Sequence, residues 1–223
     1  MRTPFCLLTF LNRCCFSLNM QKAIALLSGG IDSPVAIHLL QKQLDIIAVH
    51  FHQLPLTDKK EVDKVKELVK KLGVRKVYLI PFTEMLTTLV KECRHDDYFI
   101  LQKISMFKTA EMVAKKEGAK FLITGENLAQ VSSQTLSNLT TITKNLNLEI
   151  LRPVMTYDKK EIIKVAEKIG TYEISKGPEI CCLLGPKHPS TRSEVWKIQE
   201  QLSRIDFEKI AKSCLEKVEI VEL

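Results

Sequence analysis

Residues 22–33 combine residue types that are suited to binding an anion. An apolar run ends at Ser28-Gly29-Gly30, and Asp32-Ser33-Pro34 then opens a segment with helical periodicity. Glycine lets the backbone turn sharply and lets a ligand come close, and the start of a helix carries a partial positive charge. We therefore predict a phosphate-binding loop between a strand and a helix, with the hydroxyl groups of Ser28 and Ser33 as further donors.

Two common phosphate loops do not match this stretch. The Walker loop requires a lysine after its last glycine, but no lysine follows Gly30. The glycine spacing of dinucleotide-binding loops is absent as well. Asp32 is an unusual neighbour for phosphates unless a Mg²⁺ ion bridges the two. A structural alternative stays open, in which Ser33 is the N-cap of a helix, Pro34 is its first residue and Asp32 only favours the helix dipole.

Length and composition narrow the class of protein. The chain has 223 residues, of which 45% are hydrophobic, and this is enough to fill the core of one domain. A formal charge of +7 permits a nucleic-acid partner, although lysine-rich surface helices give the same value. No apolar run reaches the roughly 18 residues of a membrane span. The seven cysteines include no Cys-x-x-Cys pair, so we expect free thiols in a cytoplasmic protein rather than a zinc site.

The elements that must position the loop alternate between strands and helices. Such alternation predicts an α/β fold of the Rossmann-like type, in which helices flank a parallel five-stranded sheet. The expected strands are 23–27, 45–51, 76–80, 120–124 and 148–152, and the expected helices are 34–42, 59–72, 99–116 and 159–169.

Polar residues follow three of these strands. They are Ser28-Gly29-Gly30, His50-Phe51-His52 and Gly125-Glu126. The carboxyl ends of parallel strands share one edge of a sheet, where ligands bind in such folds. We therefore expect the three segments to converge on one site.

Residues 1–19 differ from the rest of the sequence. They hold a short apolar stretch and no motif, and Met20 stands directly before the first strand. We expect an extension that is disordered or lies outside the natural start. Residues 20–223 are then expected to form a single domain that ends in helices.

Several strings together resemble one known family. The loop at 28–33 resembles the pyrophosphate loop of ATP pyrophosphatases, and roughly residues 20–195 resemble the PP-loop domain of the tRNA 4-thiouridine synthase (tRNA sulfurtransferase) family, which is also tied to thiamine synthesis. The resemblance implies an adenine-nucleotide α-hydrolase fold. The strings that carry it are 28–33, 49–52, 123–135, 151–153, 157–159, 170–175, and Cys182 ahead of 186–189.

The resemblance also implies site residues, with ATP as the bound nucleotide, and Asp32 beside the phosphates adds the expectation of Mg²⁺. It makes Asp32, Lys159 and Cys182 catalytic, with Cys182 taking part in sulfur transfer. It places the nucleotide on residues that follow the first, second and fourth strands or lie near them: Leu26, Leu27, Ser28, Gly29, Gly30, Asp32, Ser33, Phe51, His52, Lys103, Gly125 and Gln134.

Each placement has a simpler alternative. His52 could be an interior histidine with its hydrogen bonds satisfied, and Lys103 could be a solvated charge on a lysine-rich helix. Gln134 and Thr135 could close a helix, and Cys182 could be a buried residue that packs in the hydrophobic core. Lysine, histidine and arginine residues shortly after Cys182 favour its thiolate instead.

From this resemblance we expect an enzyme that adenylates a uridine in tRNA at O4 and then replaces AMP with sulfur from a persulfide donor. Within the 223 residues we find no counterpart of the RNA-binding region that precedes this domain in family members. We therefore expect a separate RNA-binding protein as a partner, and no membrane. A homodimer stays open. Two other functions stay open: the same chemistry on a small molecule or sulfur-carrier protein, as in thiamine-type pathways, and a non-catalytic nucleotide-binding module.

Overall fold

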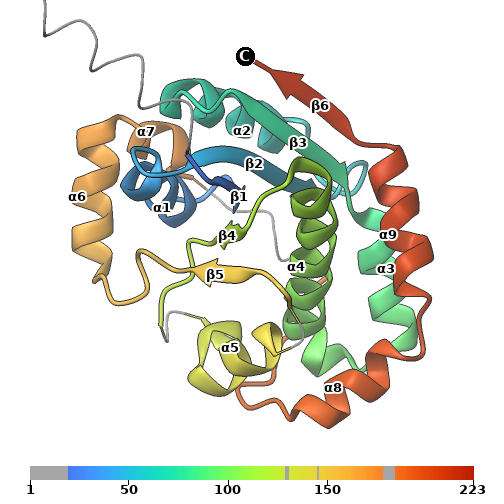
Figure 1. Ribbon diagram of the computed structural model, residues 1–223. Coiled ribbons are helices and arrows are strands. Elements are labelled where there is room, and N and C mark those ends of the chain that lie inside the picture. Colours follow the sequence, from blue (N-terminus) through green and yellow to red (C-terminus); the bar gives the residue numbers. More distant parts are fainter. Residues whose placement is uncertain (1–19, 129–130, 145, 178–183) are drawn as a thin grey trace, which may run out of the picture.

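The computed structural model describes residues 20–128, 131–144, 146–177 and 184–223, so the expected extension at 1–19 lies outside the described residues. The described chain forms one six-stranded sheet in the order β5-β4-β1-β2-β3-β6 (Figure 1). Strands β1 to β5 run parallel, and β6 pairs antiparallel with β3. The strands are β1 (Lys22–Leu26), β2 (Asp45–His52), β3 (Lys76–Pro81), β4 (Phe121–Ile123), β5 (Glu149–Leu151) and β6 (Glu219–Glu222).

The five predicted parallel strands are confirmed, and the predicted number of strands is corrected by one. The additional strand, β6, has only four residues and follows the last helix at the edge of the sheet. Its two apolar residues, Ile220 and Val221, are adjacent rather than alternating, so the sequence gives no period-2 signal there. Pairing with the exposed edge of β3 supplies the hydrogen bonds that the short segment lacks by itself.

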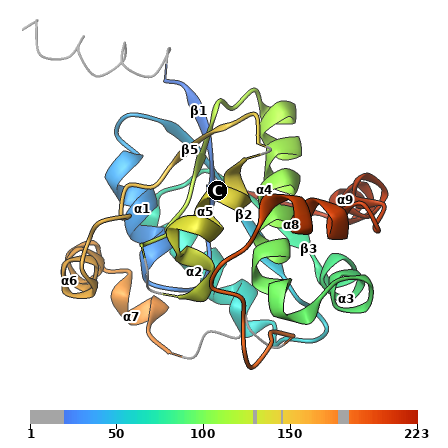
Figure 2. The same ribbon diagram turned by 90° about the horizontal axis from the view of Figure 1, so that it is seen from below.

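Helices cover both faces of the sheet, as Figures 1 and 2 show. Helices α1, α2, α6 and α7 pack on one face, while α3, α4, α8 and α9 pack on the other and α5 lies against α4. None of the described helices is both long and apolar enough to cross a membrane. The helices are α1 (Asp32–Leu40), α2 (Lys60–Leu72), α3 (Thr83–Glu92), α4 (Tyr98–Glu117), α5 (Leu136–Thr143), α6 (Lys159–Ile169), α7 (Tyr172–Ser175), α8 (Val195–Leu202) and α9 (Phe207–Glu216).

Alternation along the strands divides the core into two layers. In β1, Ile24 belongs to the layer under α4, whereas Ala23 and Ala25 belong to the layer under α1 and α2. All three side chains are fully buried. Gly73 and Gly118 end α2 and α4 in the left-handed conformation, with φ of 69° and 70°, as a helix stop requires.

The order of the strands creates a switch point beside β1. The chain moves outward from β1 through β2 to β3, and then returns to the other side of β1 to form β4 and β5. The connections that leave β1 and β4 therefore diverge, and they open a crevice at the carboxyl ends of these strands. The predicted phosphate loop lies at this crevice.

Candidate functional site

A cavity of about 640 Å³ opens at the switch point. Its walls come from the ends of β1, β2 and β4, from helix α4 and from the segment that precedes α5. Most of the predicted nucleotide-contacting residues line it: Leu26, Leu27, Ser28, Gly30, Asp32, Ser33, Phe51, Lys103, Gly125 and Gln134. The three strand-end segments predicted to converge therefore do meet.

The loop after β1 is closed by its own serine hydroxyl groups. The backbone N–H of Ser28 donates to Ser33 Oγ over 2.9 Å, and the two hydroxyl oxygens lie 3.0 Å apart. Helix α1 already begins at Asp32, and its N-cap residue Ile31 makes no side-chain capping bond. The alternative in which Ser33 caps the helix and Pro34 is its first residue is therefore wrong, because the Ser33 hydroxyl holds the loop instead.

Gly125, which follows β4, packs directly against the first turn of α1. A Cβ atom at Gly125 would lie 2.6 Å from the backbone nitrogen of Ser33 and 2.7 Å from its Cα. Both of these atoms belong to the main chain and cannot rotate away. Only glycine fits, so this contact fixes the distance between the β4 turn and the phosphate loop.

Asp32 and Lys159 form an ion pair across 127 positions of sequence. Lys159 Nζ lies 2.9 Å from Asp32 Oδ1 and 3.3 Å from Oδ2. Lys159 is the first residue of α6, whose start is fixed by a capping box between Asp158 and Glu161. Lys159 itself is not part of the cavity lining, but this ion pair connects it to the lining residue Asp32.

Lys103 is held by a buried carboxylate rather than by solvent. Glu126, which is 5% exposed, accepts from Lys103 Nζ at 2.7 Å and from Arg152 Nε at 2.8 Å. Burial alone would raise the pKa of the Glu126 carboxyl, but Lys103 and Arg152 outweigh burial and hold the pKa below its ordinary value. The sequence analysis placed Glu126 in a strand-end segment and Arg152 in a family string, but it gave neither residue a role in the site. A glutamate placed directly after a buried strand and a glycine was the signal available.

Of the two histidines on β2, His50 is the one that lines the cavity. Its Nδ1 lies 2.9 Å from the Leu27 carbonyl oxygen, which makes Nδ1 the donor. Burial lowers the pKa of His50 to about 4, so the ring is neutral and its Nε2 is an acceptor. That Nε2 is buried and has no hydrogen-bond partner among the described residues.

His52 lies outside the cavity lining, and its role as a nucleotide contact stays a prediction. The ring is partly buried, which lowers its pKa. Gly29 is likewise absent from the lining, although it belongs to the phosphate loop. The pattern of β2 did not reveal which histidine faces the cavity, because both occupy the same side of an extended strand.

Gln134 lies in a 3-10 turn, Ser132–Gln134, that borders the cavity. Its Oε1 is buried without a hydrogen-bond partner among the described residues. Thr135 begins α5, because its hydroxyl group accepts from the backbone N–H of Asn138. Gln134 and Thr135 also end the preceding 3-10 turn, as the alternative expected, and the nucleotide contact of Gln134 stays a prediction.

Cys182 and its neighbour Cys181 lie outside the described residues, but the segment that follows them can be traced. Pro189 lines the cavity, and the backbone N–H of Ser190 donates to the Asp96 carbonyl oxygen at 2.8 Å. The carbonyl oxygen of Leu184 lies 2.8 Å from His95 Nε2. The segment after Cys182 therefore forms one edge of the site. Cys93 and Cys214, the cysteines of the described part, are free thiols as expected.

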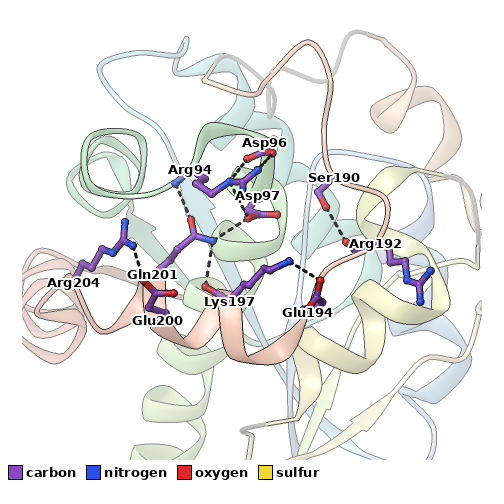
Figure 3. Close-up of polar contacts among 10 residues, drawn as sticks. All are labelled: Arg94, Asp96, Asp97, Ser190, Arg192, Glu194, Lys197, Glu200, Gln201 and Arg204. Atoms are coloured by element: carbon purple, nitrogen blue, oxygen red, sulfur yellow. Dashed lines mark hydrogen bonds and ion pairs between the residues drawn. The ribbon is translucent and has the colours of Figure 1, made fainter.

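A polar cluster fixes this edge to the rest of the fold (Figure 3). Gln201 on α8 accepts from the backbone N–H of Arg94 at 2.7 Å and donates to Asp97 at 2.9 Å. On the other side, Asn138 on α5 donates to the Ser190 carbonyl oxygen at 3.0 Å and accepts from the backbone N–H of Ser193 at 2.8 Å. Gln201 thus ties α8 to the segment before α4, and Asn138 ties residues 190–193 to α5.

Comparison with known proteins gives concordant matches. Residues 19–207 match the family described as "Thiamine biosynthesis protein (ThiI)". A probable tRNA sulfurtransferase of Moorella thermoacetica is 38% identical over 207 residues, which are 90% of this chain and 53% of that protein. A probable tRNA sulfurtransferase of Caldanaerobacter subterraneus is 40% identical over 205 residues, which are 88% of this chain and 54% of that protein.

A solved structure shares the fold. The crystal structure of a 4-thiouridine synthetase–RNA complex with bound ATP matches with a TM-score of 0.85 and 34% identity, over 91% of this chain and 55% of that one. The chain spans about half the length of the curated relatives that it matches. The resemblance found in the sequence is confirmed, and the chain belongs to the ThiI family of tRNA sulfurtransferase-like proteins, whose PP-loop fold it adopts.

Proposed function

We propose that this chain carries the ATP-dependent step of tRNA sulfur transfer, in which a uridine is converted to 4-thiouridine. The observation that carries the proposal is the meeting of the Ser28–Ser33 loop, the Asp32–Lys159 ion pair and the Gly125-Glu126 turn at one switch-point cavity. The related 4-thiouridine synthetase with bound ATP and RNA supports the same assignment.

The cavity offers a place for each part of ATP. The apolar side chains of Leu27 and Phe51 would contact the adenine, and the phosphates would lie over the Ser28–Ser33 loop. Two buried acceptors without partners, His50 Nε2 and Gln134 Oε1, fit the donors of a nucleoside, which are the ribose hydroxyl groups and the adenine amino group. A ligand that paired with both atoms would remove the cost of burying them unpaired.

Asp32 is the residue that would hold Mg²⁺. The described residues contain no group of three or more histidine, cysteine or acidic side chains that could hold a metal by themselves. Mg²⁺ commonly takes one carboxylate together with phosphate oxygens and water, and this fits a single aspartate on the phosphate loop. When bound, the ion would neutralise phosphate charge. Asp32 would then exchange its contact with Lys159 for the metal, which would free the lysine ammonium for the substrate phosphates.

The chemistry takes place in two displacements. The uridine O4 attacks the α-phosphorus of ATP, the α–β bridging P–O bond breaks, and pyrophosphate leaves with the electron pair. A persulfide sulfur then attacks C4, and the C4–O4 bond breaks as AMP leaves. A second thiolate then attacks the cysteine sulfur of the S–S bond and forms a disulfide with it, so that the outer sulfur stays on C4 with the electron pair. A thiol reductant would reduce this disulfide before the next turnover. Pro189, which follows Cys182 in the sequence, lines the same cavity, and this supports a role for Cys182 in the sulfur transfer.

One observation favours a different substrate as the acceptor of sulfur. The matching family is described as a thiamine biosynthesis family, and a sulfur-carrier protein would undergo the same adenylation and sulfur transfer at a carboxylate. Mass analysis of the tRNA nucleosides of a deletion strain separates the two acceptors. Loss of 4-thiouridine supports the tRNA substrate, whereas an unchanged 4-thiouridine level together with a thiamine requirement supports the carrier protein.

Asp32→Ala tests the adenylation step. We expect pyrophosphate release from ATP and tRNA to be abolished while the fold is kept, because Asp32 would hold the metal on the leaving group. A carboxylate that only favoured the helix dipole would contribute about 0.3–1 kcal/mol of stability and nothing to turnover. A pyrophosphate-release assay beside a thermal melt separates the two, and a variant with normal turnover would exclude the metal role.

A further inference from the structure

Lys64 on helix α2 covers the outer side of the phosphate loop. A Cβ atom at Gly29 would lie 3.0 Å from Lys64 Cδ and 3.8 Å from Nζ, so the lysine stem rests directly on the glycine backbone. Glu61, one turn earlier on the same helix, lines the cavity. This face of α2 is therefore turned toward the site, and the absence of a side chain at Gly29 allows the lysine to lie there.

The ion pairing of Lys64 differs from that of three other cations around the site. Lys103 and Arg152 are paired with Glu126, and Lys159 is paired with Asp32. No carboxylate of the described residues lies within ion-pair distance of Lys64, which is only partly exposed. Its Nζ donates to the Ser175 carbonyl oxygen at 3.3 Å, a long bond to a neutral acceptor. Lys64 thus forms no ion pair within the described residues, and its ammonium group can pair with a ligand.

We propose that Lys64 is a further phosphate-binding residue, whose ammonium group contacts the β- and γ-phosphates of ATP from the α2 side of the loop. This inference rests on the proposed function, since it requires ATP in the cavity. When the α–β bridging P–O bond breaks, its electron pair stays on the departing pyrophosphate. The Lys64 ammonium group would stabilise the charge that gathers there, without itself gaining or losing a proton. The flexible four-carbon stem lets the ammonium leave the Ser175 carbonyl for a phosphate oxygen.

Three variants test the proposal by calorimetric binding of ATP, inorganic pyrophosphate and AMP. Lys64→Met keeps the stem on Gly29 and removes the charge, and we expect it to weaken ATP and pyrophosphate binding between about 10- and 100-fold. AMP binding should stay unchanged, because AMP has no β- or γ-phosphate. Lys64→Arg should restore most of the ATP affinity. Lys70→Met, which removes an exposed lysine near the other end of α2, should bind all three ligands as the unmodified chain does.

Each outcome decides the proposal. Equal ATP and pyrophosphate affinity in Lys64→Met and the unmodified chain would overturn the role of Lys64 while leaving the proposed function intact. An equal loss for AMP and ATP would also overturn it, because the residue would then maintain the shape of the cavity rather than bind phosphate. An unmodified chain that binds neither ATP nor pyrophosphate would overturn both the role of Lys64 and the proposed function.

Discussion

The buried ring of His50 affects the stability of the fold and also borders the proposed nucleotide site. Burial lowers its pKa from 6.5 to about 4, and Nδ1 donates to the Leu27 carbonyl oxygen just before the phosphate loop. A histidine with a depressed folded-state pKa contributes stability that is fully present above the unfolded pKa. That stability is lost as the pH falls toward the folded value.

The expected effect is a loss of about 2 kcal/mol from this group between pH 7 and pH 5. In His50→Asn the amide can still donate to Leu27 but does not titrate. The variant should therefore lose less stability over this interval than the unmodified chain does. Urea unfolding at both pH values measures the difference. Identical pH dependence in the two proteins would mean that His50 is not held neutral in the fold.

Glu126 is a residue whose removal should be costly. It is buried between Lys103 and Arg152, which hold its pKa below the ordinary value. Glu126→Gln would leave two cations without a compensating charge, and we expect a loss of about 3–5 kcal/mol in the free energy of unfolding. Combining it with Lys103→Met should recover part of the loss, since one of the uncompensated cations is then gone. A single-variant loss below about 1 kcal/mol would contradict this account.

At the scale of elements, one glycine sets the distance between two strand ends. A Cβ at Gly125 would meet the main-chain atoms of Ser33, so Gly125→Ala must push the β4 turn away from α1. We expect a stability loss of about 1–3 kcal/mol, as for an overpacked site, and weaker ATP binding. Gly29→Ala is the comparison for stability alone, because its added methyl group meets only the flexible Lys64 side chain, whereas its ATP affinity depends on the phosphate loop to which Gly29 belongs. ATP titration and thermal melting check both, and normal ATP affinity in Gly125→Ala would show that the two turns need not touch.

The parallel strands and the helices α1, α2, α4 and α6 were predictable because each combines an apolar period with a clear start or stop. Gly73 and Gly118 marked two of the helix ends. The convergence of the strand-end segments was predictable for the same reason, since parallel strands place their carboxyl ends on one edge. The family resemblance then identified ten of the residues that line the cavity.

The remaining features depend on contacts between distant segments. Ser33 follows a loop and precedes Pro34, which is the local pattern of a helix cap, yet its hydroxyl bonds to Ser28. The ion pair between Glu126 and Arg152 joins residues that are 26 positions apart. Lys64 lies on α2, which connects β2 with β3, and it packs on Gly29, which follows β1. Local patterns carry no information about such contacts, because they form only once the sheet has brought its strand ends together.

At the scale of the molecule, charge determines how the chain would meet a nucleic acid. The sequence has 33 lysine and arginine residues against 26 acidic residues, and many of its cations form ion pairs on the surface or around the cavity. The cations of the described residues that are in no such pair, among them Lys71, Lys116, Lys164 and Lys209, are spread over α2, α4, α6 and α9. This differs from a dedicated nucleic-acid-binding domain, in which basic residues are gathered along one stripe.

We therefore expect this chain by itself to bind tRNA weakly and with strong salt dependence. Each phosphate contact releases condensed counterions, so about three contacts to duplex RNA would weaken binding roughly 40-fold between 50 and 200 mM salt. Fluorescence anisotropy with labelled tRNA at several salt concentrations gives the slope, and addition of an RNA-binding partner should raise the affinity without changing the ATP site. Tight binding that does not respond to salt would contradict this expectation, because recognition would then rest on contacts to bases or sugars rather than on lysine and arginine contacts to phosphates.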